Sequence, residues 1–105
     1  MSDWFETLEG TLERVWETLA LGVTDAAQPA RRPTFATVSP SGWPEARTVV
    51  LRLADKDAGA VCVHTDLHSD KVKSLRSSAR AALHIWDAKQ DLQIRLQTTV
   101  AIQSG

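Results

Sequence analysis

Hydrophobic and polar positions alternate along the end of the chain, and this alternation predicts a long β-strand over 92–102. The apolar face of this strand consists of Leu92, Ile94, Leu96, Val100 and Ile102. The polar face consists of Gln93, Arg95, Gln97 and Thr99. We expect one face to pack in the core and the other to meet solvent or a polar site.

Shorter runs of apolar and β-branched residues predict four further strands, over 34–38, 47–53, 61–65 and 81–86. The proline, glycine and serine residues of 39–44 are typical of a turn, as is the segment 54–59. The first two strands therefore form a predicted antiparallel hairpin. Trp86, at the end of the fourth, is expected to lie in the core.

Apolar residues recur three and four positions apart over 3–21, which predicts an amphipathic helix. Its apolar stripe consists of Trp4, Leu8, Leu12, Val15, Trp16 and Leu19. Asp3 followed by Glu6 is typical of a capping box, and Gly22 is expected just beyond the helix end. A second, short helix is predicted over 69–77.

These elements predict a mainly β fold in a single domain over 1–105: an antiparallel barrel or sandwich with an N-terminal helix and one short internal helix. The length of 105 residues suits one hydrophobic core. A long strand left at an open sheet edge is an aggregation hazard. We therefore expect a second chain, or further residues of a longer protein, to pair with 92–102.

The stretch 47–53 carries an arginine near each end of an otherwise apolar strand. In a strand the two arginines face opposite ways. Arg47 shares one face with Val49, Leu51 and Leu53. Arg52 shares the other face with Thr48 and Val50. A buried guanidinium needs an anionic or hydrogen-bonding partner, so the pattern indicates a bound anion. The alternative is two arginines that extend from the strand ends to water.

A second polar stretch, 64–71, crosses the expected junction between a strand and the short helix. It supplies hydroxyl, imidazole and ammonium groups from His64, Thr65, His68, Ser69 and Lys71. A helix N-terminus favours anions, because its N–H groups are free and its dipole end is positive. Together with the two arginines, these groups are suited to a phosphate monoester. Alternatively, Ser69 is only a helix cap and Lys71 only a surface charge.

Composition narrows the function classes. The formal net charge of −1 gives no indication of a nucleic-acid partner. The single cysteine, Cys62, lies in an apolar run and is predicted to be a buried thiol. No segment approaches the ~20 apolar residues of a membrane-spanning helix, and the acidic N-terminus lacks the pattern of a secretory signal. The histidines lack a His-x-x-x-His helix motif with a carboxylate partner, so no metal site is predicted. We expect a cytoplasmic protein.

Five ordered segments resemble the pyridoxamine 5′-phosphate oxidase-like FMN-binding split barrels. They are Pro44 with Arg47–Arg52, His64–Leu67, Ser69 with Lys71, Arg80–Trp86, and Leu92–Arg95. Each segment is short, and their shared order and spacing carry the resemblance, which extends over about residues 34–102. The N-terminal helix and the Arg80–Trp86 strand are closer to the oxidase-related branch than to the true oxidase.

The resemblance implies FMN held at the interface of a homodimer. Arg47 and Lys71 are the implied phosphate ligands, with Ser69 beside them. Val49 and Val50 are implied to lie along the isoalloxazine ring, with backbone groups of the stretch, including Thr48 and Leu51, at its polar edge.

Three further positions follow from the same resemblance. His64 and Thr65 take the place of an aromatic–threonine pair at the flavin. Gln93 is implied to contact the flavin from the partner subunit, and Arg52 stands where the true oxidase has a lysine near cofactor and substrate.

The chain departs from the family pattern in two respects. Asp70 stands where the family commonly has an arginine, and its charge repels a phosphate. The family's second half, which supplies further barrel strands and the substrate-recognising groups, has no counterpart in the sequence. The resemblance therefore implies an FMN-binding protein, with FMN-dependent oxidoreductase as the candidate activity. The open alternatives are a cofactor-free dimerising split-barrel module and a split barrel that binds haem or a deazaflavin.

Overall fold

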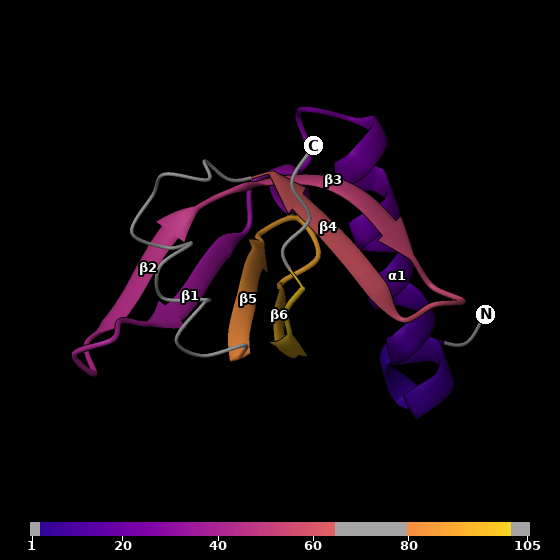
Figure 1. Ribbon diagram of the computed structural model, residues 1–105. Coiled ribbons are helices and arrows are strands. Elements are labelled where there is room, and N and C mark those ends of the chain that lie inside the picture. The colour runs from indigo at the N-terminus through magenta and orange to yellow at the C-terminus, as the bar shows by residue number, and fades with distance from the viewer. Residues whose placement is uncertain (1–2, 65–79, 102–105) are drawn as a thin grey trace.

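The computed structural model describes residues 3–64 and 80–101, and the predicted helix over 69–77 lies outside them. This part of the chain folds into strands and an N-terminal helix (Figure 1). The helical elements are η1 (Trp4–Glu6), α1 (Leu8–Thr24) and η2 (Pro29–Arg31). The strands are β1 (Thr34–Val38), β2 (Pro44–Thr48), β3 (Val50–Asp55), β4 (Ala60–His64), β5 (Arg80–Asp87) and β6 (Leu92–Thr99).

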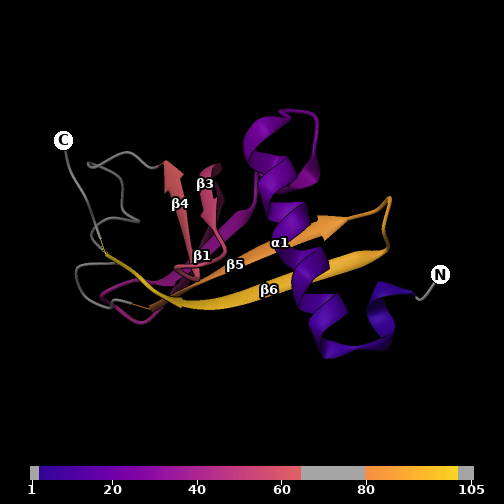
Figure 2. The same cartoon turned by 90° about the vertical axis from the view of Figure 1, so that its right-hand side faces the viewer.

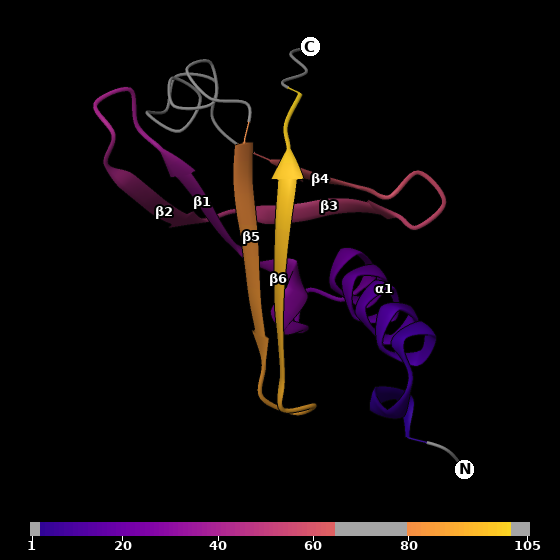
Figure 3. The ribbon, with the colours of Figure 1, turned by 90° about the horizontal axis from the view of Figure 1, so that it is seen from below.

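The strands form two antiparallel sheets. The larger sheet has the order β2-β1-β5-β6, and β3 pairs with β4 in the smaller one. Seen from below, β3 and β4 cross the long β5–β6 pair (Figure 3). β1 occupies the predicted residues 34–38, and the predicted turn over 39–44 joins it to β2 as an antiparallel hairpin. Among the described residues, β6 pairs with β5 alone, so its other edge is open there.

The predicted single strand over 47–53 is wrong, because the chain changes sheet in its middle. β2 ends at Thr48, β3 begins at Val50, and Val49 lies between them. The Val49 N–H donates to the Pro33 carbonyl, with 3.0 Å between nitrogen and oxygen. The side chain of Val49 is only 3% exposed, so the crossing point is anchored in the core.

A register shift in β3 corrects two more expectations. Leu51 lies opposite Val63, but Leu53 lies opposite Cys62, so Arg52 is an extra residue on its strand. The shift turns Leu53 away from the core, and its side chain is 53% exposed. Simple alternation had predicted that Leu53 shares a face with Leu51, which is buried. Cys62 is an exposed free thiol rather than a buried one.

Helix α1 begins and ends later than predicted. Thr7 is its N-cap, with the Thr7 hydroxyl oxygen accepting from the Gly10 N–H at 2.9 Å; the expected Asp3–Glu6 capping box does not form. The helix continues to Thr24, so Gly22 lies inside it rather than beyond its end.

The apolar stripe of α1 is buried only in its second half. Leu19 is 1% exposed, whereas Leu8 is 73% and Leu12 51% exposed. The N-terminal turns therefore contribute little to the core, and the prediction that Leu8 and Leu12 pack with the rest of the stripe is wrong.

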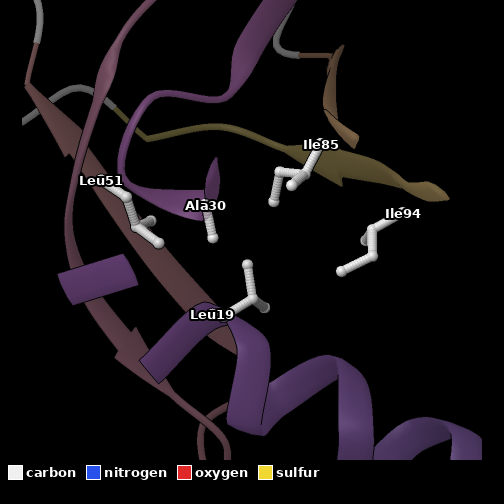
Figure 4. Packing of buried hydrophobic residues seen from close by; sticks show 5 residues of the cluster. All are labelled: Leu19, Ala30, Leu51, Ile85 and Ile94. Atoms are coloured by element: carbon white, nitrogen blue, oxygen red, sulfur yellow. The ribbon is translucent and has the colours of Figure 1, made fainter. Parts of the chain in front are cut away.

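The core lies between α1 and the two sheets. Figure 2 shows α1 lying across β5 and β6, and one buried cluster joins these elements through Leu19, Ala30, Leu51, Ile85 and Ile94 (Figure 4). A second cluster extends the core along the larger sheet through Phe35, Val49, Ala81 and Leu83. In the described part of the chain, no helix has the length and apolar character needed to cross a membrane.

Alternation divides the larger sheet into two faces. We call inner face the side that packs on α1 and β3; its buried residues include Phe35, Leu83, Ile85 and Ile94. We call outer face the opposite side, which carries Thr34 and Ala36 of β1, Ala46 and Thr48 of β2, Arg80, Ala82, His84 and Trp86 of β5, and Gln93, Arg95 and Gln97 of β6. None of these outer-face residues is buried. Trp86, expected in the core, is 51% exposed there.

Candidate functional site

The predicted site residues of the 47–52 stretch lie where the chain passes from one sheet to the other. Arg47 and Thr48 end β2, and Val50, Leu51 and Arg52 begin β3. His64, the last residue of β4, lies directly opposite Val50. The structure therefore brings His64 to the 47–52 stretch, as the sequence interpretation requires.

The side chains of this stretch divide into exposed polar groups and buried apolar ones. Arg47, Arg52 and His64 are exposed. Val49 and Leu51 are 3% and 1% exposed, so their side chains belong to the core and their backbone groups are what they offer to a ligand.

Two features of the described residues make this region receptive to an anion. No hydrogen bond or ion pair to another described residue engages the guanidinium of Arg47 or Arg52. β2 pairs only with β1, and β3 only with β4, within the described ranges, so backbone groups along one edge of each strand are free of strand partners there. Free N–H groups beside unpaired cations suit a phosphate and the polar edge of a planar ring.

Gln93 is far from this stretch within one chain. It lies on β6, at the opposite edge of the larger sheet from β2. Three strand spacings of about 4.8 Å separate the two edges. Gln93 also belongs to the outer face, whereas Arg47 lies opposite Phe35, which faces inward. One copy of the chain does not bring Gln93 and Arg47 together.

The sequence interpretation missed a row of polar side chains on the outer face. Strand register aligns Thr48, Thr34, His84 and Arg95 across all four strands. His84 Nε2 and Gln93 Oε1 are 2.9 Å apart, which makes a hydrogen bond between β5 and β6. The signal was present in the alternation of 80–87, whose even positions are Arg80, Ala82, His84 and Trp86.

The remaining predicted site residues, Thr65, Ser69 and Lys71, lie outside the described residues, as does Asp70. Of the predicted site residues, the structure thus describes 47–52 with His64, and Gln93 on the outer face.

Comparisons with known proteins give this arrangement a family. Residues 1–104 match the family model described as "Pyridoxamine 5′-phosphate oxidase, FMN-binding domain". A pyridoxine/pyridoxamine 5′-phosphate oxidase of Microcystis aeruginosa is 40% identical over 67 residues, which are 64% of this chain and 30% of the oxidase. The crystal structure of a pyridoxamine 5′-phosphate oxidase-related, FMN-binding protein from Nostoc punctiforme superimposes with a TM-score of 0.70 at 24% identity. That match covers 83% of this chain and 44% of the Nostoc chain, so this chain spans less than half the length of either relative.

The fold is a split barrel, mainly β and antiparallel with an N-terminal helix. The chain belongs to the pyridoxamine 5′-phosphate oxidase family of FMN-binding domains. FMN is the cofactor of this family, which confirms the family and the cofactor expected from the ordered segments.

Proposed function

We propose that this chain binds FMN at the interface of a homodimer and acts there as a flavin-dependent oxidoreductase. In this proposal one copy supplies the stretch 47–52 with His64, and the second copy supplies its Gln93. Lys71, Ser69 and Thr65 complete the phosphate and ring contacts that the family resemblance implies.

The separation of Gln93 from Arg47 carries the proposal. The two side chains lie at opposite edges of the larger sheet and on opposite sides of it. A flavin that touches both therefore needs two copies of the chain.

The side chains of the outer face support the proposal that a second copy of the chain covers this face. Small side chains lie next to each other on three neighbouring strands: Ala46, Ala36 and Ala82. Two larger apolar side chains on the same face are also exposed, Val38 at 47% and Trp86 at 51%. A face that combines exposed apolar side chains with polar ones, here the row Thr48, Thr34, His84 and Arg95, is typical of a protein interface.

The residues present fit FMN. The exposed guanidinium groups of Arg47 and Arg52 match its phosphate charge, and the strand edges offer backbone groups to its ring. When bound, the flavin supplies the electron transfer, and the protein supplies binding, orientation and electrostatic tuning. Because the chain covers 30% of the Microcystis oxidase, the proposal does not extend to oxidation of pyridoxamine phosphate.

The cytoplasm is the proposed location, since an exposed free thiol such as Cys62 suits a reducing compartment. A cofactor-free dimerising module is the second candidate function. It is favoured by Asp70, whose negative charge adjoins the proposed phosphate ligand Lys71 in the sequence.

The deciding experiment is the visible absorption spectrum of the purified protein before and after addition of FMN and desalting. A retained flavin spectrum with quenched tryptophan fluorescence supports the proposal. A colourless protein that releases all added FMN supports the cofactor-free module, and a haem or deazaflavin spectrum identifies another ligand.

Arg47→Ala then tests the phosphate contact. Loss of a charge-assisted contact worth about 1.5–3 kcal/mol weakens FMN binding roughly 10- to 150-fold. Riboflavin, which lacks the phosphate, should bind parent and variant alike. Lys56→Ala, at an exposed position in the turn after β3, is the charge-matched control. Equal FMN affinity of parent and Arg47→Ala would remove Arg47 from the site.

Ala82→Arg tests the homodimer by placing a charge in the middle of the outer face. Light scattering should give the parent a mass of two chains of 11.5 kDa and the variant a mass of one, with loss of FMN. Ala27→Arg, at an exposed position outside the sheets, is the control and should stay dimeric. A monomeric parent that retains FMN contradicts the interface site.

A further inference from the structure

His84 and Gln93 form a polar pair across β5 and β6 on the outer face. The ring nitrogen Nε2 of His84 lies 2.9 Å from the amide oxygen Oε1 of Gln93. An amide oxygen only accepts hydrogen bonds, so His84 Nε2 carries the proton in this arrangement. The NH₂ group of Gln93 is then left to donate to a further partner.

The residues around His84 leave the side-chain amide of Gln93 as its hydrogen-bond partner. Arg95 lies directly opposite on β6, and Thr34 directly opposite on β1. Among the described residues of the outer face, the other charged groups near the imidazole are Arg95 and, further along β5, Arg80. Both are cationic, so no described carboxylate on this face competes with Gln93 for the His84 proton.

The hydrogen bond fixes which end of the Gln93 amide points outward. A free carboxamide offers a donor or an acceptor with equal ease, because its two ends are nearly the same shape. An amide whose oxygen is held by His84 directs its NH₂ donor away from His84. A group that is pre-oriented in this way loses less conformational freedom when a ligand binds.

We propose that His84 is a positioning residue for the flavin: it holds the Gln93 amide so that the NH₂ group donates to an acceptor atom of the flavin bound by the second copy. This inference rests on the proposed function. It adds a residue that does not touch the flavin and sets the hydrogen-bonding polarity of the one that does.

The test is a double-mutant cycle on FMN affinity in the full chain, measured by quenching of FMN fluorescence. His84→Leu and Gln93→Leu should each weaken FMN binding by about threefold to tenfold, the range of one net hydrogen bond. The double variant should bind no more weakly than Gln93→Leu, because His84 acts only through that side chain. His84→Gln, whose amide can donate to Gln93 Oε1, should restore the affinity to within about twofold.

Lys89→Leu is the control, since Lys89 is an exposed residue in the turn between β5 and β6, away from the outer face, and this substitution should leave FMN binding unchanged. The bound flavin gives a second readout: its absorption bands should shift equally in His84→Leu and Gln93→Leu and return in His84→Gln. A purely structural role does not move these bands and regain them in this pattern.

Failure of this inference is distinct from failure of the proposed function. If the parent holds no FMN, the flavin site itself is wrong and the inference falls with it. If the parent binds FMN but His84→Leu binds it equally well, or the two losses add in the double variant, the positioning role is overturned. A His84→Leu protein that melts earlier without FMN or loses its dimer mass assigns His84 a structural role and also overturns it.

Discussion

The two faces of the four-stranded sheet are built from the same strands and differ in almost every property. The inner face packs Ile85 and Ile94 against Leu19 of α1 and Leu51 of β3, and these four side chains are 1–3% exposed. The outer face carries His84, Gln93 and Arg95. These residues are the sequence neighbours of Ile85 and Ile94, and all three are accessible to solvent. Because neighbouring residues point to opposite sides, buried apolar side chains alternate with accessible polar ones along β5 and β6.

This comparison predicts its largest effect on the inner face. Ile94 is 3% exposed and packs in the cluster with Leu19 and Ile85. Ile94→Ala should therefore lower the free energy of unfolding by about 2–5 kcal/mol, since it removes buried area and leaves a cavity. Urea denaturation measures the change. Gln97→Ala, three residues along on the outer face, should change it by no more than about 0.5 kcal/mol. Similar losses in both variants would erase the distinction between the faces.

The sequence predicted the sheet best where alternation is complete. In β6 the odd positions are exposed and Ile94 is buried, as the alternation predicted. The predicted strand over 92–102 is too long, because β6 ends at Thr99 and the described residues 100 and 101 lie outside it. The boundaries of β1 were also predicted correctly, because proline and glycine mark its end.

The sequence did not predict the crossing at Val49 or the shift at Arg52. Thr48, Val49 and Val50 all favour strands, and nothing local marks a change of sheet between them. The crossing exists because Val49 and Leu51 are buried in different clusters, which only the tertiary fold determines. The exposed Leu8 and Leu12 have the same explanation, since periodicity shows which side of a helix is apolar but not how far its neighbours extend.

The candidate site was predictable to the extent that it is continuous in sequence. The stretch 47–52 carries its own signal in two arginines, and register adds His64. His84 was missed because its relevance depends on the register between β5 and β6, which places it beside Gln93.

A second prediction concerns the helix that covers the inner face. A Cβ added at Gly22 would lie 2.6 Å from the backbone carbon of Ala30 and 2.7 Å from its Cβ, so α1 and η2 must move apart. We expect Gly22→Ala to lower the free energy of unfolding by about 1–3 kcal/mol. Alanine is the better helix former by about 1 kcal/mol, so the sign of the measured change decides between close packing and helix propensity. Ala20→Ser, at an exposed position on the same helix, is the control.

The smallest effect is expected at Asp25, which lies on neither face and caps the end of α1. The Asp25 carboxylate accepts from the Ala27 N–H at 3.0 Å and from the Gln28 amide at 3.1 Å, and these hydrogen bonds lower its pKa below the usual value of 3.8. A lowered pKa in the folded state means that ionised Asp25 stabilises the fold. That contribution is fully present above about pH 3.8 and is lost as the pH falls through the folded-state pKa.

NMR titration of the Asp25 carboxyl measures its pKa in the folded state and extends the comparison of the two faces. The parent should titrate below 3.8. Gly22→Ala displaces η2 and should move the Asp25 pKa back toward that value, because the segment that holds Ala27 and Gln28 joins α1 to η2. Gln97→Leu on the outer face should leave the titration unchanged. If the Asp25 pKa shifts in both variants, the outer face is coupled to the end of α1 through the core. If it shifts in neither, the 25–28 turn keeps its hydrogen bonds independently of how α1 packs on the inner face.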